Sequence, residues 1–298
     1  MRVTARCRRS VQRVRMTPAS VNVSRSFLSS PTVDTGFGDS SIVQLTASVQ
    51  ELGAAPDQGR ASWPIAVGRA LSTAREALCC ARDIQFEPPT SCAVERAERL
   101  ASACSRLGQK LRMEVHVRGH VPSGPCIVVA NHLSYLDPLA IGWTLPVGAV
   151  AKSEIMNWPG VGEAVADLGI VFVRRGCPQS GAVALRKTMR LLDSDVPVLV
   201  FPEGTTTTGR DVLPFARGAF GVARLMRVPV IPAAIRYNCE DAPWVGSASL
   251  LPHALKLHRR NEIHAELVFG PSLQPMAFSD ASALADATRQ CIRSVLLP

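Results

Sequence analysis

Several features that mark other classes of protein are missing from this 298-residue sequence. No stretch reaches the ~18 uncharged apolar residues of a membrane-spanning helix, and the N-terminus lacks the apolar core of a secretory signal. The nine cysteines are scattered without a C-x-x-C pair, so the sequence indicates neither a disulfide framework nor a zinc site. We therefore expect a reducing compartment and a chain that stays on the cytoplasmic side of a bilayer.

Aromatic residues are also scarce, at 5% of the chain, and no recognised nucleic-acid-binding module is present. The chain carries 33 Lys and Arg against 24 Asp and Glu, a formal net charge of +9, which predicts anionic partners. Arginines without aromatic stacking partners supply mainly salt-sensitive attraction to nucleic acid. We therefore expect no nucleic acid among the partners, and favour acidic membrane lipids or phosphorylated metabolites.

The N-terminal segment has an unusual composition. Residues 1–33 contain seven arginines and no acidic residue, and Pro18 and Pro31 interrupt any periodicity. This composition predicts that residues 1–60 form a mostly disordered basic tail. An organellar transit peptide is the less favoured alternative, because a flexible tail or an overextended reading frame has the same composition.

Two amphipathic helical patterns follow and predict a helical hairpin over residues 61–112. In the first, Arg75 and Arg82 flank an apolar stripe with heptad-like spacing, formed by Val67, Leu71, Ala74, Leu78 and Ala81. A second stripe runs over residues 97–111, after a break at Pro88 and Pro89. The stripes could pack on each other or on the main core, or the hairpin could dock on a membrane, with the arginine heads at lipid phosphates.

From residue 113 to the C-terminus, short β-type segments alternate with helical ones. Seven strands are expected, at Met113–Arg118, Cys126–Ala130, Val147–Ala151, Gly169–Val173, Val198–Phe201, Val230–Ile235 and His264–Phe269. The helices expected between and after them are Pro138–Thr144, Ser180–Asp193, Gly218–Met226 and Ala281–Leu297. The alternation predicts an α/β domain over residues 113–298, with a mixed, largely parallel seven-stranded sheet flanked by helices.

A histidine and an aspartate follow one of the buried strands. Residues 131–138 read Asn-His-Leu-Ser-Tyr-Leu-Asp-Pro, which places His132 and Asp137 where functional groups gather in α/β sheets. On a regular helix the two would point ~140° apart, so we expect His132 to precede the first helical turn. Such a pair is the minimal machinery for removing a hydroxyl proton, although a helix-capping role remains an alternative on these residues alone.

Two other predicted strands also end in residues suited to anions. Phe-Val-Arg-Arg ends at Arg174 and Arg175, and Phe-Pro-Glu-Gly-Thr brings Glu203, Gly204 and Thr205 directly after a strand. Guanidinium groups, backbone N–H groups and hydroxyls suit a phosphate, whereas Glu203 would repel one unless it is paired. The arginines could equally be solvated surface charges. Neither a nucleotide-binding P-loop nor a G-x-S-x-G elbow is present.

Four blocks occur in one order: Asn-His-x4-Asp, Phe-Val-Arg-Arg, Phe-Pro-Glu-Gly-Thr and Val-Pro-Val-Ile-Pro. Together, over residues 105–275, they resemble the glycerolipid acyltransferases typified by bacterial 1-acylglycerol-3-phosphate acyltransferases. The resemblance implies that His132 is the general base, that Asp137 orients it, and that Arg175, Glu203, Gly204 and Thr205 bind the acceptor. Arg174 stands where many members have an acid, and Arg217 adjoins a position that is often basic, so both are further candidates for acceptor binding.

The resemblance further implies an O-acyltransferase that forms phosphatidate from 1-acylglycerol-3-phosphate in phospholipid biosynthesis. Acyl-CoA or acyl-carrier protein would be the acyl donor, with no cofactor and no metal. It also favours membrane docking of the hairpin, and therefore a peripheral enzyme, since this chain lacks the spanning segment of many bacterial members. The alternatives are acylation of another lyso-lipid, including lyso-ornithine lipid, and a non-catalytic lipid-binding protein.

Overall fold

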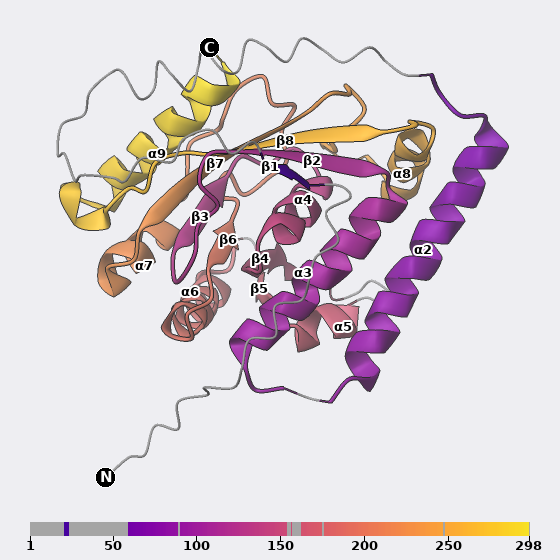
Figure 1. Cartoon of the computed structure of the whole chain (residues 1–298). Helices are drawn as coiled ribbons and strands as arrows, with labels where there is room; N and C mark the ends of the chain where they lie inside the picture. Colours follow the sequence, from indigo (N-terminus) through magenta and orange to yellow (C-terminus); the bar gives the residue numbers. More distant parts are fainter. Residues whose placement is uncertain are drawn as a thin grey trace.

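A computed structural model of the chain describes residues 21–23, 59–88, 90–153, 156, 162–174, 176–246 and 248–297. These residues form an α/β fold around one sheet (Figure 1). Its strands are β1 (Val21–Val23), β2 (Met113–Arg118), β3 (Ile127–Ala130), β4 (Gly148–Lys152), β5 (Val171–Val173), β6 (Val198–Val200), β7 (Val230–Tyr237) and β8 (Ile263–Phe269). The helices are α2 (Trp63–Phe86), α3 (Ala93–Lys110), α4 (Leu136–Thr144), α5 (Gly162–Asp167), α6 (Pro178–Asp193), α7 (Gly218–Met226), α8 (Leu250–His258) and α9 (Ala281–Leu296), with a 3₁₀ turn at Pro275–Ala277.

The strand order is β1-β2-β8-β7-β3-β6-β4-β5, and every pair is parallel except β7 with β8. The predicted mixed, largely parallel sheet of seven strands is confirmed as β2 to β8. β1 adds an eighth strand that the sequence did not predict, and it lies within residues 1–60. The rest of that predicted tail, up to residue 58, lies outside the described residues.

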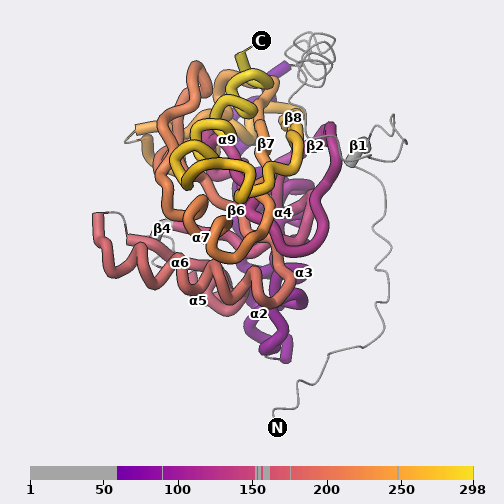
Figure 2. Tube along the Cα trace, turned by 90° about the vertical axis from the view of Figure 1, so that its left-hand side faces the viewer, coloured from indigo at the N-terminus to yellow at the C-terminus, as the bar shows by residue number. Residues whose placement is uncertain are grey.

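Helices cover both faces of the sheet (Figures 1 and 2). All four residues of β3 are buried, as expected of a central parallel strand with helices on both sides. Ile127 and Val129 join the cluster that includes α6, α7 and α9, whereas Val128 and Ala130 join the cluster formed with α4 and the end of α3. This alternation places the end of β3 between two packed layers, so the loop that follows it is anchored on rigid structure.

The predicted helical hairpin is present as α2 and α3, and the two helices use their faces differently. The apolar stripe of α3 points inward, where Ala97, Ala101 and Cys104 are buried. α2 instead turns polar residues toward the protein: Arg106 of α3 pairs with Glu76 at 2.7 Å and with Asp83 at 2.8 Å. The inward side of α2 therefore combines these ion pairs with the buried small residues Ala66, Cys80 and Ala81.

Most of the predicted apolar stripe of α2 faces outward as a result. Val67, Leu71 and Leu78 are exposed, Leu71 to 67%, while Ala81 is buried. Phe86, at the end of the helix, is 82% exposed. The alternative in which the two stripes pack on each other is therefore wrong for the large residues of α2. Among the described residues, no helix has the length and apolar character needed to cross a bilayer.

The contact between α3 and α4 generates a stability prediction. A Cβ added at Gly108 would lie 2.7 Å from the buried ring of Trp143, whereas one added at Gly68 of α2 would meet nothing within 4 Å. We expect Gly108→Ala to lower the free energy of unfolding by about 1–3 kcal/mol through overpacking. Gly68→Ala should raise it by up to about 1 kcal/mol, because alanine favours a helix. Urea denaturation measures both, and stabilisation by both variants would contradict the packing.

Candidate active site

His132 and Asp137 lie at the junction between the end of β3 and the start of α4. β3 ends at Ala130 and α4 begins at Leu136, so His132 precedes the helix and Asp137 sits in its first turn. His132 Nδ1 lies 2.8 Å from Asp137 Oδ2, and the Asp137 side chain is fully buried while that of His132 is 18% exposed. The short irregular segment before α4 brings together two side chains that a regular helix would keep apart.

The Asp137 carboxylate accepts hydrogen bonds from several groups. The backbone N–H groups of Leu133 and Ser134 donate to Oδ2 at 2.6 and 2.9 Å, and the Tyr237 hydroxyl donates to Oδ1 at 2.8 Å. These donors take the place of water around a buried carboxylate. An ionised carboxylate only accepts, so the neutral His132 ring carries its proton on Nδ1 and leaves Nε2 free to accept one.

Tyr237 is the member of this group that sequence reasoning missed. It ends β7, 100 residues beyond Asp137, and no local motif marks it. Burial, together with the charge of Asp137 and the hydrogen bond to it, raises the pKa of the Tyr237 hydroxyl well above its usual value. The hydroxyl therefore stays protonated and can donate to Asp137.

The main chain of His132 is held by the segment that follows β6. Its N–H donates to Glu203 Oε1 at 2.8 Å, and its C=O accepts from the N–H of Thr207 at 2.8 Å. The second oxygen of Glu203 accepts from the N–H of Leu213 at 2.9 Å. Phe201 stacks on the His132 ring, with centroids 4.1 Å apart and planes within 20°. Together these contacts leave the imidazole little freedom.

Glu203 therefore sits beside the main chain of His132. Burial raises the pKa of its carboxyl, and the N–H groups of Leu213 and His132 lower it in part. Both carboxylate oxygens are used by backbone donors. Paired in this way, Glu203 can lie close to an anion site without facing it.

Asn131 ties the same loop to the neighbouring strand. Its side chain donates to the Ile235 C=O at 2.9 Å and accepts from the Ile235 N–H at 2.8 Å. The Leu133 C=O accepts from the N–H of Trp244 at 2.8 Å. The loop that carries His132 is thus bound to both β7 and the segment that follows it.

Among the residues predicted to bind the acceptor, those that the structure describes follow the carboxyl ends of β5 and β6 or directly precede α7. Gly204 and Thr205 are exposed directly after Glu203, and Gly204 has a φ of 70°, which favours glycine in the turn closed by its N–H to the Phe201 C=O. Arg174 is exposed after β5, three strand positions from β3, or about 14 Å across the sheet. Arg175 lies outside the described residues.

Arg217 directly precedes α7, and its side chain is directed to another helix. Its guanidinium donates to Ser282 of α9 at 3.1 Å. The N–H of the preceding residue, Ala216, donates to the Pro202 C=O at 2.9 Å, so the start of α7 adjoins the turn that carries Gly204. The structure therefore brings the main chain of Arg217 near the site while its side chain contacts α9.

Comparisons with a family of known proteins and with individual relatives all point to acyltransferases. Residues 112–236 match the Acyltransferase family. The chain is 33% identical over 201 residues to the lyso-ornithine lipid O-acyltransferase of Pseudomonas aeruginosa, covering 64% of this chain and 76% of that protein. It is 40% identical over 127 residues to the human 1-acyl-sn-glycerol-3-phosphate acyltransferase alpha, and this match covers 41% of this chain and 44% of that protein.

A solved structure supports the same assignment. The 1-acyl-sn-glycerophosphate acyltransferase PlsC from Thermotoga maritima superposes with a TM-score of 0.53 at 26% sequence identity, covering 68% of this chain and 78% of that one. The predicted resemblance is confirmed by these matches in sequence and in fold. The chain thus belongs to the acyltransferase family that includes the lyso-ornithine lipid and 1-acylglycerol-3-phosphate enzymes, and it is an acyltransferase of this lyso-lipid type.

Proposed function

We propose that the chain transfers a fatty acyl group from acyl-CoA or acyl-carrier protein to the free hydroxyl of a lyso-lipid, with His132 as the general base. The observation that carries this proposal is the His132 Nδ1 to Asp137 Oδ2 contact of 2.8 Å, which leaves Nε2 free. The hydroxyl proton passes to Nε2 as the hydroxyl oxygen attacks the thioester carbonyl. The C–S bond then breaks, and the leaving thiolate takes the proton from Nε2, so the products are an ester and a thiol.

The first candidate acceptor is lyso-ornithine lipid. The relatives named for that acceptor, from Pseudomonas aeruginosa and Brucella abortus, are 33% identical, and the match covers 76% and 71% of their lengths. 1-Acylglycerol-3-phosphate, which the sequence motifs favour, is the second candidate, supported by 40% identity to the human enzyme. The longer matches favour the lyso-ornithine acceptor, and in that case the product is a lipid other than phosphatidate.

We assign acceptor binding to the exposed residues Gly204, Thr205 and Arg174, together with Arg175 and with Arg217, which directly precedes α7. Their backbone N–H groups, hydroxyl and guanidinium groups suit a phosphate or a carboxylate. Glu203 is not included among these acceptor-binding residues, because both of its carboxylate oxygens accept hydrogen bonds from backbone N–H groups. Its proposed role is to position His132.

We further propose that α2 docks the enzyme on the surface of an anionic membrane. The exposed Val67, Leu71 and Leu78 form an apolar face, and Arg75 and Arg82 are exposed beside it. Large apolar side chains that point outward while the polar face makes ion pairs inward are typical of an interfacial helix. This attachment is peripheral, on the cytoplasmic side.

The acyl-transfer proposal predicts the behaviour of His132→Ala. We expect kcat to fall at least ~100-fold, since no base removes the hydroxyl proton, with little change in lyso-lipid binding. The measurement is transfer of labelled acyl groups from each donor to lyso-ornithine lipid, 1-acylglycerol-3-phosphate and lysophosphatidylcholine. His120→Ala, which changes an exposed histidine on the loop after β2, should keep wild-type activity. Acyl transfer by His132→Ala at the wild-type rate would contradict the proposed role of His132.

Tyr237→Phe tests the hydrogen bond to Asp137. Loss of a hydrogen bond to a charged group is worth about 1.5–3 kcal/mol, so we expect kcat to fall by about tenfold or more while KM for the lyso-lipid changes little. The matched variant is Tyr135→Phe, because the Tyr135 hydroxyl bonds to His253 and the chain has two tyrosines. Equal losses of kcat in the two variants would contradict a specific role for Tyr237.

Membrane docking predicts a change in vesicle binding for Leu71→Glu with Leu78→Glu. Burying a leucine is worth about 1.5–3 kcal/mol, so we expect the double variant to partition at least tenfold less onto phosphatidylglycerol-containing vesicles in a sedimentation assay. Leu225→Glu is the control, since Leu225 is 69% exposed on α7, which lies on the opposite side of the molecule from α2 (Figure 1). Unchanged partition of the double variant would refute docking through α2.

A further inference from the structure

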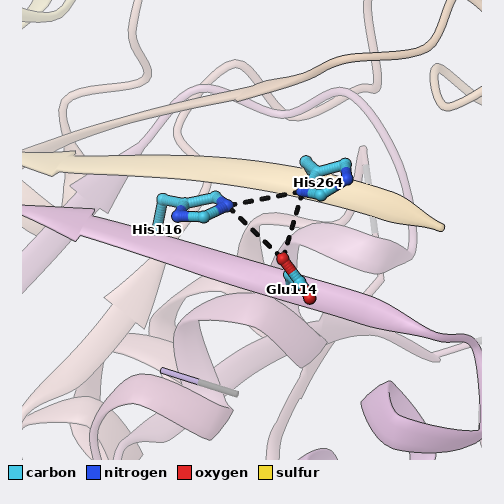
Figure 3. A group of neighbouring side chains, drawn as sticks. All are labelled: Glu114, His116 and His264. Atoms are coloured by element: carbon cyan, nitrogen blue, oxygen red, sulfur yellow. Dashed lines mark hydrogen bonds and ion pairs between the residues drawn. The ribbon is translucent and has the colours of Figure 1, made fainter. Parts of the chain in front are cut away.

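Three side chains that could ligate a metal converge on the sheet, away from His132 and Asp137. Glu114 and His116 come from β2, and His264 comes from the adjacent strand β8 (Figure 3). Glu114 lies opposite His264 in the strand register, so alternate residues of both strands point to the same face. The three ligand atoms lie within 4.8 Å of one another.

The distances between these atoms have the dimensions of a tetrahedral metal site. His116 Nε2 lies 3.4 Å from His264 Nδ1, and Glu114 Oε2 lies 3.7 and 3.3 Å from those two nitrogens. Zinc bonds of about 2.0–2.1 Å in a tetrahedron place neighbouring ligand atoms about 3.3–3.5 Å apart. A single ion could therefore contact all three atoms with little movement of the side chains.

The other ring nitrogen of His264 also has the expected neighbour. Its Nε2 lies 3.3 Å from Glu262 Oε2. Histidines that bind metal commonly donate their second N–H to a carboxylate, which fixes the tautomer and makes the coordinating nitrogen a better ligand. A proton held on Nε2 by Glu262 leaves the Nδ1 lone pair of His264 directed toward His116 and Glu114.

We propose that Glu114, His116 and His264 bind a Zn²⁺-class divalent transition metal ion that links β2 to β8. Two imidazoles and a carboxylate suit such ions better than Mg²⁺ or Ca²⁺, which prefer oxygen ligands. The Glu114, His116 and His264 side chains are 46%, 32% and 24% exposed, so an ion can reach them from solvent. A fourth position remains for water or another ligand.

This site is separate from the catalytic pair. Arg236 of β7 pairs with Glu266 of β8, which lies on the same face as His264, whereas the next residue, Tyr237, contacts Asp137 on the opposite face. The proposed ion therefore lies across the sheet from the groups that perform acyl transfer. We assign it a structural role, in holding β2 against β8.

The test is zinc binding by the full chain after its accessible thiols are alkylated and its metals are removed with a chelator. After dialysis against Zn²⁺, mass spectrometry should find about one ion more per wild-type chain than per His116→Ala/His264→Ala chain. Zn²⁺ should raise the Tm of the wild type and not that of the double variant. His120→Ala, a matched exposed histidine, should behave like the wild type.

Two further variants keep the test decisive. Glu262→Gln should weaken zinc binding about 10- to 100-fold while leaving the three ligands in place. If circular dichroism shows that the double variant does not fold, Glu114→Gln, at a half-exposed position, is used in its place. This variant should weaken zinc binding more than tenfold. Equal zinc content in the wild type and in the ligand variants, or equal loss in His120→Ala, would overturn the proposal.

Discussion

A buried carboxylate needs donors in place of the water it has lost, and Asp137 receives them from four groups. Two are backbone N–H groups of the loop itself, one is the His132 ring and one is the Tyr237 hydroxyl. The loop conformation, the orientation of the imidazole and the position of the end of β7 are therefore coupled through a single side chain. The free Nε2 of His132, on which the proposed general-base chemistry depends, is a consequence of that coupling.

A second constraint is the orientation of α2, whose acidic side chains face the protein while most of its large apolar side chains face outward. Ion pairs from Glu76 and Asp83 to Arg106 hold its polar face against α3, so its leucines remain outside. Arg69 extends the same arrangement by donating to the His258 C=O at the end of α8. An acyltransferase that acts on lyso-lipids needs access to a bilayer surface, and this packing presents an apolar face without requiring a spanning helix.

The sequence predicted those parts of the fold and site that leave a local pattern. Seven strands, the hairpin and the placement of His132 before α4 follow from apolar periodicity and from the spacing between His132 and Asp137. Tyr237 was missed because its role depends on strand pairing across 100 residues, and the His116 and His264 pair was missed because 148 residues separate its members. The backbone role of Glu203 was also hidden, since a motif shows which residue is present and not which way its carboxylate points.

The protonation state of His132 tests the proposed chemistry most sharply. It can be read from ¹⁵N chemical shifts of the histidine-labelled chain, with the His132 signal identified by its loss in His132→Ala. We predict that the neutral ring carries its proton on Nδ1, toward Asp137, and leaves Nε2 unprotonated. The fraction of neutral His132 with its proton on Nδ1 should be lower in Tyr237→Phe than in the wild type. A neutral His132 with its proton on Nε2 would contradict the assignment of this nitrogen as the base.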